Sequence, residues 1–272
     1  PPEHETVALY EQLKAGSIPS PYLATPADRS SALPSAVVRG MNNLPPPAGV
    51  FIGREAELST VSARLADPAC RLLTITGPGG AGKTRLAIEA GRAQLIHFPH
   101  GVCFVSLLAV DRPELVPAAV LQALGAAARG PLTPQQQVGR LLAERQMLLI
   151  LDNFEHLLAV TPESGSQDAT AILHDWLAAA GGLKLLVTSR ERLNLRDEWL
   201  LPLSGLAIPD APPQTDETFR EAEAAPDLTG YAATRFFLHC VQRVRPGYLA
   251  DDAEARAIVR ICRQVDGSPL AI

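Results

Sequence analysis

The sequence predicts an α/β protein: a three-layer sandwich around a five-stranded, mainly parallel sheet, followed by a small helical module. Two observations support this prediction. Between residues 71 and 203, short apolar runs alternate with longer helix-forming stretches, an order typical of a parallel sheet covered on both faces. After residue 204 the strand-like runs stop, and helical patterns alone continue.

The expected elements follow this alternation along the chain. We expect strands at 71–76, 101–107, 146–151, 183–189 and 198–202, mostly apolar because parallel strands are buried on both faces. We expect helices near 55–66, 84–97, 113–127, 134–144, 168–180, 230–245 and 252–265. A further helix is expected to begin at Pro269 and to be cut off by the end of the chain.

Changes in composition predict the domain boundaries. Residues 1–16 are expected to be the tail of an upstream helical domain, with Gly16 ending its helix. Residues 17–49 are rich in proline, which fixes φ and removes donors, and are expected to be a linker. Residues 50–206 form the expected α/β domain, and 207–272 a helical domain that is incomplete at its C-terminus.

Charge and composition exclude several classes. The 272-residue chain has a net charge of −5, which argues against direct DNA contact by this segment. No apolar run is long enough to cross a bilayer, and no signal peptide precedes the first helix, so a cytoplasmic protein without a membrane partner is expected. The four cysteines are scattered without metal-ligand spacing, as reduced core thiols are.

The most informative motif is the glycine-rich octet Gly77–Thr84, GPGGAGKT. It matches the phosphate-binding loop pattern G-x-x-x-x-G-K-[ST], between a predicted strand and a predicted helix. A glycine-rich turn that binds nothing is the alternative, but these flanks are the context that the motif needs. The sequence therefore predicts a P-loop NTPase sandwich.

Each part of this loop has an expected role. Glycines let the backbone approach phosphates closely, and loop N–H groups together with the positive helix end attract the anion. Lys83 is expected to reach the β- and γ-phosphates, and the Thr84 hydroxyl to hold Mg²⁺. The loop thus predicts a nucleotide with Mg²⁺, and the resemblance given below implies that this nucleotide is ATP or ADP. The predicted loop contacts are Gly77, Gly79, Gly80, Ala81, Gly82, Lys83, Thr84 and Arg85.

A second element is the apolar run 147–151, which ends in Asp152. A carboxylate at the end of a strand beside the loop is expected to orient Mg²⁺. Efficient hydrolysis also needs a carboxylate that positions water. The next residue is Asn153, and Glu155 is the nearest acid. Whether Glu155 positions water or caps the following turn is left open. His156 is expected to have a surface or capping role.

Arg190 follows another apolar strand, 185–189. If that strand lies between the loop strand and the Asp152 strand, Arg190 points toward the γ-phosphate. Its planar guanidinium group can form two parallel hydrogen bonds to phosphate oxygens. An ordinary surface salt bridge is the alternative.

Together these motifs resemble the STAND class of signal-transduction ATPases, which includes NB-ARC domains. The resemblance rests on FIGRE at 51–55, on 77–84, on 148–153 with Glu155 and His156, on 188–190, on LSGL at 203–206 and on GSPL at 267–270. It implies that Arg190 senses the γ-phosphate and that Pro269 packs against the base. It also implies adenine and ribose contacts from Val50, Phe51, Ile52, Gly53 and Arg54.

The opening helix resembles the end of a bacterial transcriptional activation domain, as in SARP-type regulators. This implies an upstream DNA-binding domain and a downstream repeat domain in the same polypeptide.

Three functions are therefore weighed. The first is an ATP/ADP switch with slow hydrolysis, in which nucleotide exchange controls the attached domains and a nucleotide-dependent homo-oligomer is expected. Its catalytic residues would be Lys83, Asp152, Glu155 and Arg190, with Thr84 and Asp152 holding Mg²⁺. The second is an AAA-like ring ATPase with fast turnover. The third is a scaffold that keeps ADP permanently, for which Asn153 leaves room.

Overall fold

In the computed structural model, residues 40–47, 49–126, 131–159, 168–209 and 227–272 are described, and all belong to one compact unit, Val38–Ile272. The expected helix within 1–16, most of the expected linker, and residues 210–226 lie outside the described residues. The α/β architecture predicted from the alternation of apolar runs is confirmed.

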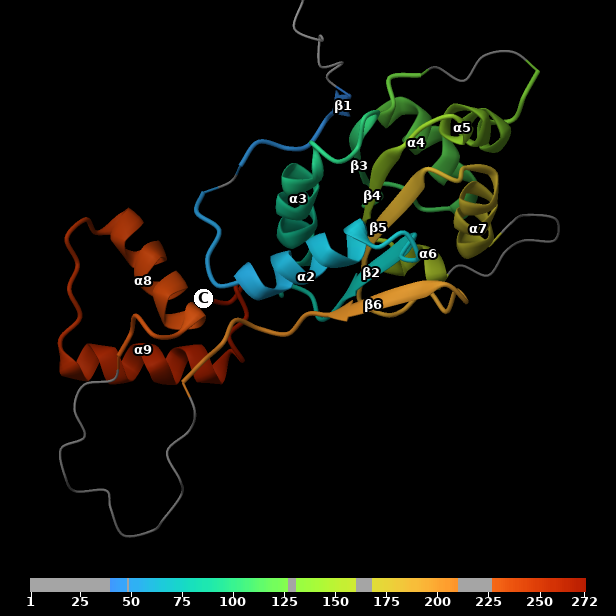
Figure 1. Cartoon of the computed structure of the whole chain (residues 1–272). Coiled ribbons are helices and arrows are strands. Elements are labelled where there is room, and N and C mark those ends of the chain that lie inside the picture. The colour runs from blue at the N-terminus through green and yellow to red at the C-terminus, as the bar shows by residue number, and fades with distance from the viewer. Residues whose placement is uncertain (1–39, 48, 127–130, 160–167, 210–226) are drawn as a thin grey trace, which may run out of the picture. The chain divides into compact units, whose positions relative to one another are not determined.

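The sheet has six strands, all parallel, in the order β1-β3-β4-β5-β2-β6 (Figure 1). The strands are β1 (Met41–Asn42), β2 (Leu72–Thr76), β3 (Gly101–Ser106), β4 (Met147–Asp152), β5 (Leu183–Ser189) and β6 (Glu198–Pro202). The five expected strands are all present, with ends that agree to within one residue. Strand β5 lies between β2 and β4. This strand order is the condition under which Arg190 was expected to point toward the γ-phosphate.

The expectation of five strands is wrong, because β1 adds a sixth at the edge. Met41 pairs with Gly101, and Asn42 pairs with Val102. Gly101 has φ of 94°, and a Cβ there would lie 2.0 Å from the Met41 carbonyl oxygen, so this pairing needs glycine. A strand of two residues inside a proline-rich stretch has no periodicity by which sequence could reveal it.

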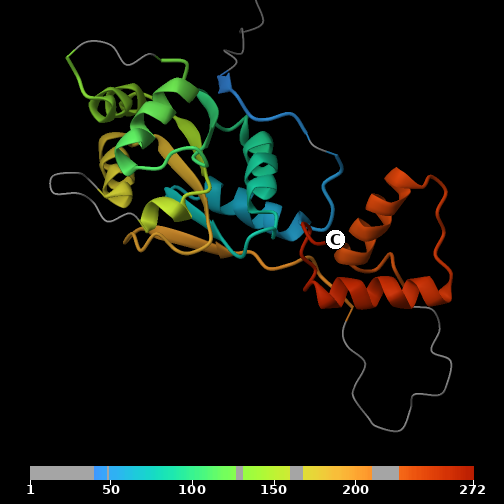
Figure 2. The ribbon, with the colours of Figure 1, turned by 180° about the vertical axis from the view of Figure 1, so that it is seen from behind.

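Helices cover both faces of the sheet, because successive residues of a strand face opposite layers. In β4, Leu149 and Leu151 belong to one core and Leu148 and Ile150 to the other. Figure 1 shows the two helical layers, and the same division is visible from behind in Figure 2. The first core includes α4 (Val116–Ala123), α5 (Pro134–Ala143) and α7 (Ala169–Ala179); the second includes α2 (Glu55–Ala66) and α3 (Lys83–Gln94).

Two short elements complete this domain. The 3₁₀ turn η1 (Pro113–Leu115) precedes α4, and the one-turn helix α6 (Glu155–Leu158) follows β4. Helix α6 begins three residues after Asp152, so it carries Glu155 near the carboxyl edge of the sheet.

The helical module contains α8 (Ala232–Val244) and α9 (Asp252–Gln264), which share a small core with Leu206. Leu206 N–H donates to the Gly267 carbonyl at 2.7 Å, so the end of α9 is held by the segment that follows β6. Residues 269–271 form a turn, and Ile272 N–H donates to the Ser268 carbonyl at 3.1 Å; the helix expected from Pro269 stays a prediction. Among the described helices, none combines the length and apolarity needed to span a bilayer.

Candidate nucleotide-binding site

The glycine loop joins β2 to α3, and its backbone is tightly constrained. Gly77, Gly80 and Gly82 have φ of 151°, 81° and 94°, a region that favours glycine. A Cβ at Gly77 would lie 2.1 Å from the Leu203 carbonyl oxygen. Gly82 caps α3, and its carbonyl accepts from Leu86 N–H at 2.9 Å. The loop therefore presents bare backbone at the positive end of a helix, which suits a polyanion.

Lys83 is the first residue of α3, and its ammonium group folds over the loop. Its Nζ donates to the carbonyls of Gly77 at 2.8 Å and Pro78 at 3.0 Å. Burial lowers the pKa of Lys83, while the negative charge of Glu155 opposes that shift. The ammonium thus lies on the loop itself and within the field of the neighbouring acid.

Asp152 ends β4 and is nearly buried, with 7% of its surface exposed. Its Oδ1 accepts from the Thr84 hydroxyl at 2.7 Å and from the Thr188 hydroxyl at 2.6 Å. Thr188 Oγ1 in turn accepts from Asn153 N–H at 2.9 Å. The two predicted magnesium ligands therefore touch each other, and β5 fixes the carboxylate from the other side.

Arg190 follows β5, and Glu155 begins α6. Arg190 Nε and Glu155 Oε1 form an ion pair at 3.2 Å. The Nη2 atom of the same guanidinium would lie 3.4 Å from a Cβ at Gly79, so Arg190 also lies against the phosphate loop. The predicted sensor and the predicted water-positioning acid are thus partners of each other, beside the loop.

Asn153 lies directly after Asp152, in a left-handed conformation with φ of 66°. His156 Nε2 lies 2.6 Å from the Val110 carbonyl oxygen, so this nitrogen donates. In the neutral ring Nδ1 is then an acceptor, and it receives Asn153 Nδ2–H at 3.2 Å. His156 therefore holds the turn after β4 rather than simply facing solvent.

Arg54 is buried, and protein atoms occupy its guanidinium group. Its Nη1 pairs with Glu57 Oε1 at 2.6 Å, and its Nη2 donates to the carbonyls of Ala81 and Ser204. Arg54 therefore joins three segments: the start of α2, the phosphate loop and the chain after β6. Its adenine or ribose contact stays a prediction, and these protein acceptors would compete with it.

The rest of the 50–54 segment lies between α3 and the helical module. Arg85 lies over the Phe51 ring at 5.9 Å and donates to the Gly49 carbonyl at 2.8 Å. Gly53 has φ of 71°, and a Cβ there would lie 2.1 Å from Ala232 Cβ, at the start of α8. The segment therefore contacts α3 on one side and the start of α8 on the other.

The turn after α9 meets the phosphate loop directly. A Cβ at Gly80 would lie 2.8 Å from Leu270 Cβ and 3.2 Å from Ser268 Oγ. A Cβ at Gly82 would lie 3.9 Å from Pro269 Cγ. Pro269 is thus beside the loop, where a bound base could meet it, and its packing against a base stays a prediction.

Residues 45–195 match the family described as Novel STAND NTPase 1. This match covers more than half of the chain and includes the phosphate loop, Asp152 and Arg190. The chain belongs to this STAND NTPase family.

Relatives of this STAND NTPase include named regulators. This chain is 32% identical over 204 residues to a Mycobacterium tuberculosis protein provisionally named an HTH-type transcriptional regulator. The alignment covers 74% of this chain and 19% of that protein. The chain is 30% identical over 182 residues to the regulatory protein AfsR of Streptomyces griseus, covering 63% of this chain and 17% of AfsR. The chain therefore spans less than a fifth of the length of these relatives.

A solved structure shows the same fold at low identity. The structure of the Drosophila ORC bound to DNA aligns with 98% of this chain and 65% of its own, with a TM-score of 0.52 and 14% identity. This likeness concerns the fold alone.

Sequence reasoning did not identify Thr188 as a partner of Asp152 in the STAND NTPase site, although the two are hydrogen-bonded. The hydroxyl pair at the end of β5 was a usable signal, because the carboxyl ends of neighbouring parallel strands meet at one edge. Ser204, whose carbonyl accepts from Arg54, left no such signal, since a backbone acceptor is independent of residue type.

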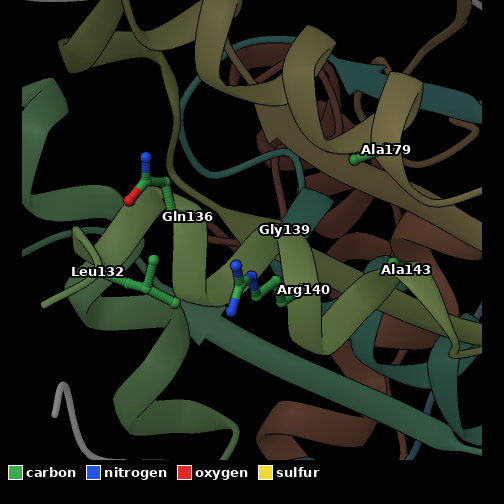
Figure 3. A pocket seen from close by; sticks show the side chains of 6 residues that line it. All are labelled: Leu132, Gln136, Gly139, Arg140, Ala143 and Ala179. Carbon is green, nitrogen blue, oxygen red and sulfur yellow. The ribbon is translucent and has the colours of Figure 1, made fainter. Parts of the chain in front are cut away.

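The STAND NTPase also has a groove away from these residues (Figure 3). This groove has a volume of about 380 Å³ and lies along α5 and the end of α7. Its lining residues are Leu132, Gln136, Gly139, Arg140, Ala143 and Ala179. Its polar lining side chains are Gln136 and Arg140.

Proposed function

We propose that this STAND NTPase is an ATP/ADP-operated switch, in which the bound nucleotide sets the position of the helical module. The observation that carries the proposal is the contact of the turn after α9 with the phosphate loop, where Leu270 and Ser268 lie against Gly80. A phosphate chain on this loop would have to meet the same turn. Nucleotides with two and three phosphates would then favour different positions of the module.

The residues of the loop suit a nucleotide. Glycines with positive φ leave the backbone uncovered, and Lys83 supplies a positive charge on the loop. Thr84 and Asp152 supply two oxygens in contact at 2.7 Å, the hard donors that Mg²⁺ prefers. Among the described residues, no group of three or more His, Cys, Asp or Glu could hold a metal, so phosphate oxygens and water would complete the shell. The ion would neutralise phosphate charge.

The side chains around Asp152 support slow hydrolysis. Asn153 takes the position directly after Asp152, and its amide, which is hydrogen-bonded to His156, cannot act as a general base. We expect fewer than about one turnover per minute, well below ordinary enzymes. A turnover of many per second in purified protein would favour an AAA-like ring ATPase instead.

The direct test measures what the purified 272-residue chain binds. Calorimetry with ATP and ADP in the presence of Mg²⁺ is expected to show binding, and Lys83→Ala is expected to weaken it by about 100-fold. Arg140→Ala, which removes a cation on α5 away from the loop, is the matched control and should bind normally. Unchanged binding by Lys83→Ala would refute the role proposed for the loop.

Release of nucleotide by denaturation, followed by chromatography, distinguishes a switch from a scaffold. A switch is expected to exchange its nucleotide when the other form is added in excess. A protein that retains ADP through repeated exchange would be a scaffold.

The relatives named as regulators suggest what the switch controls. We propose that the chain is one part of a longer regulator, whose DNA-binding and repeat domains lie outside residues 1–272 and respond to the nucleotide state. Nucleotide-dependent assembly of the whole protein is part of this proposal, and sedimentation of the full-length protein with ATP and with ADP would test it.

A further inference from the structure

The ion pair between Glu155 and Arg190 connects two strands at the carboxyl edge of the sheet. Glu155 follows β4 at the start of α6, and Arg190 follows the neighbouring strand β5. The pair uses Arg190 Nε and Glu155 Oε1, 3.2 Å apart, while Nη2 of the same arginine lies toward Gly79 of the phosphate loop. One guanidinium group therefore faces two places that attract it: the carboxylate and the loop where phosphates would bind.

The two partners differ in how firmly they are held. The Arg190 side chain is 68% exposed, whereas the Glu155 side chain is 16% exposed. Glu155 Oε2 is buried and has no hydrogen-bond partner among the described residues. A buried carboxylate with one oxygen unsatisfied depends strongly on its remaining partner. Glu155 is therefore the buried partner of the pair, and Arg190 is the exposed one.

The charges around the loop favour a competition between Glu155 and a third phosphate for Arg190. Lys83 Nζ lies on the loop carbonyls, and Arg190 lies between the loop and the Glu155 carboxylate. A third phosphate would bring more negative charge to the same place. A guanidinium pairs with phosphate at least as well as with carboxylate, so the phosphate would draw Arg190 away from Glu155.

We propose that Glu155 sets the preference of the site between ATP and ADP by competing with the γ-phosphate for Arg190. In the ADP state Glu155 keeps the arginine. In the ATP state the arginine turns to the third phosphate and Glu155 loses its partner, which weakens ATP binding relative to ADP. This inference rests on the proposed function, because it requires that the loop bind both nucleotides.

The test is a double-mutant cycle on nucleotide affinity. The dissociation constants of ADP and of β,γ-imido-ATP, which is not hydrolysed, are measured by calorimetry for wild type, Glu155→Gln, Arg190→Ala and the double variant. Glu155→Gln is expected to raise the affinity for the triphosphate relative to ADP by about threefold to fivefold, the range of a partly exposed ion pair. In the Arg190→Ala background the same change is expected to leave that ratio within about 1.5-fold.

Two controls make the cycle specific. Glu191→Gln removes an exposed acid next to Arg190 and is expected to leave the ratio unchanged. If Glu155→Gln does not fold, Glu155→Asp withdraws the carboxylate by one methylene and is expected to move the ratio in the same direction.

Each outcome has a distinct meaning. An equal gain in the Arg190→Ala background would show direct repulsion between Glu155 and phosphate, and would overturn the competition. An unchanged ratio in Glu155→Gln would also overturn it, while wild-type binding of both nucleotides would leave the proposed function standing. Wild-type protein that binds neither nucleotide would refute both.

Discussion

The side of the site where Mg²⁺ is predicted to bind (the metal side) and the side where the base is predicted to bind (the base side) are built differently. On the metal side, Asp152, Thr84 and Thr188 come from elements fixed by the sheet, and their side chains bond to one another. On the base side, the start of α2, the phosphate loop and the chain after β6 meet around Arg54, and two of its three partners are backbone carbonyls. The comparison shows that contacts between side chains gather at strand ends, whereas the contacts of Arg54 are mostly with loop backbone.

The largest expected effect is on the metal side, with Asp152→Asn. The amide keeps an oxygen that Thr84 and Thr188 can still bond, so the fold should survive, but the charge that holds Mg²⁺ is lost. Hydrolysis measured by phosphate release should fall by about 100-fold or more, while binding of nucleotide without Mg²⁺ changes little. Asp197→Asn, at an exposed turn before β6, is the control. Retained magnesium-dependent hydrolysis in Asp152→Asn would argue against this ligand.

The next effect is on the base side, with Gly205→Ala. The added Cβ would lie 1.7 Å from the Asp266 carbonyl oxygen, so the junction between the chain after β6 and the end of α9 must open. We expect a loss of about 3 kcal/mol in the free energy of unfolding, measured with urea. Gly139→Ala, inside α5 with no atom within 4 Å, is the matched control and should gain about 0.5 to 1 kcal/mol. Equal stabilities of the two variants would show that the junction is not rigid.

Arg54→Met separates the two roles considered for this arginine. It leaves the Ala81 and Ser204 carbonyls and Glu57 without their shared donor, and should reduce the free energy of unfolding by about 2 kcal/mol. Arg140→Met on the surface of α5 should have no such effect. If nucleotide affinity fell by more than about tenfold without any loss of stability, Arg54 would be a base or ribose contact instead.

The smallest effect is expected for His156→Phe, which keeps a ring but removes the bonds to Asn153 and Val110. Releasing the turn after Asp152 should lower kcat by about fivefold with little change in KM. His156→Asn, which can still bond Asn153, should recover part of the rate. Full activity in His156→Phe would return this histidine to the surface role that the sequence suggested.

The same comparison explains how much the sequence could predict. Strand ends are set by apolar runs, and parallel strands bring those ends to one edge, so the residue pattern predicts that Asp152 lies beside the loop and Thr84. It places Arg190 there only if β5 lies between β2 and β4. The position of β5 between β2 and β4 agrees with the condition under which Arg190 faces the loop. The five expected strands agree with the structure for the same reason, because each buries apolar residues on both faces.

The remaining features depend on long-range contacts without a local pattern. Strand β1 consists of two residues and is defined only by its pairing with β3. Arg190 forms the kind of salt bridge that was weighed as its alternative role, with Glu155 as the partner, and neither residue alone indicates the other. Whether Glu155 caps the turn or positions water stays a prediction. Arg54 donates to the backbone carbonyls of Ala81 and Ser204. Because every residue has such a carbonyl, the sequence indicated that the segment 50–54 matters but not which residues Arg54 contacts.

The position of β1 has a consequence for communication along the polypeptide. Residues 1–39 precede this edge strand in the chain, and four inter-strand steps separate it from β2, which leads into the phosphate loop. At the usual strand spacing this is roughly 19 Å of sheet. A signal carried through the sheet from β1 to the phosphate loop would therefore cross three intervening strands, β3, β4 and β5, and disrupting the Met41–Gly101 pairing would interrupt that route at its first step.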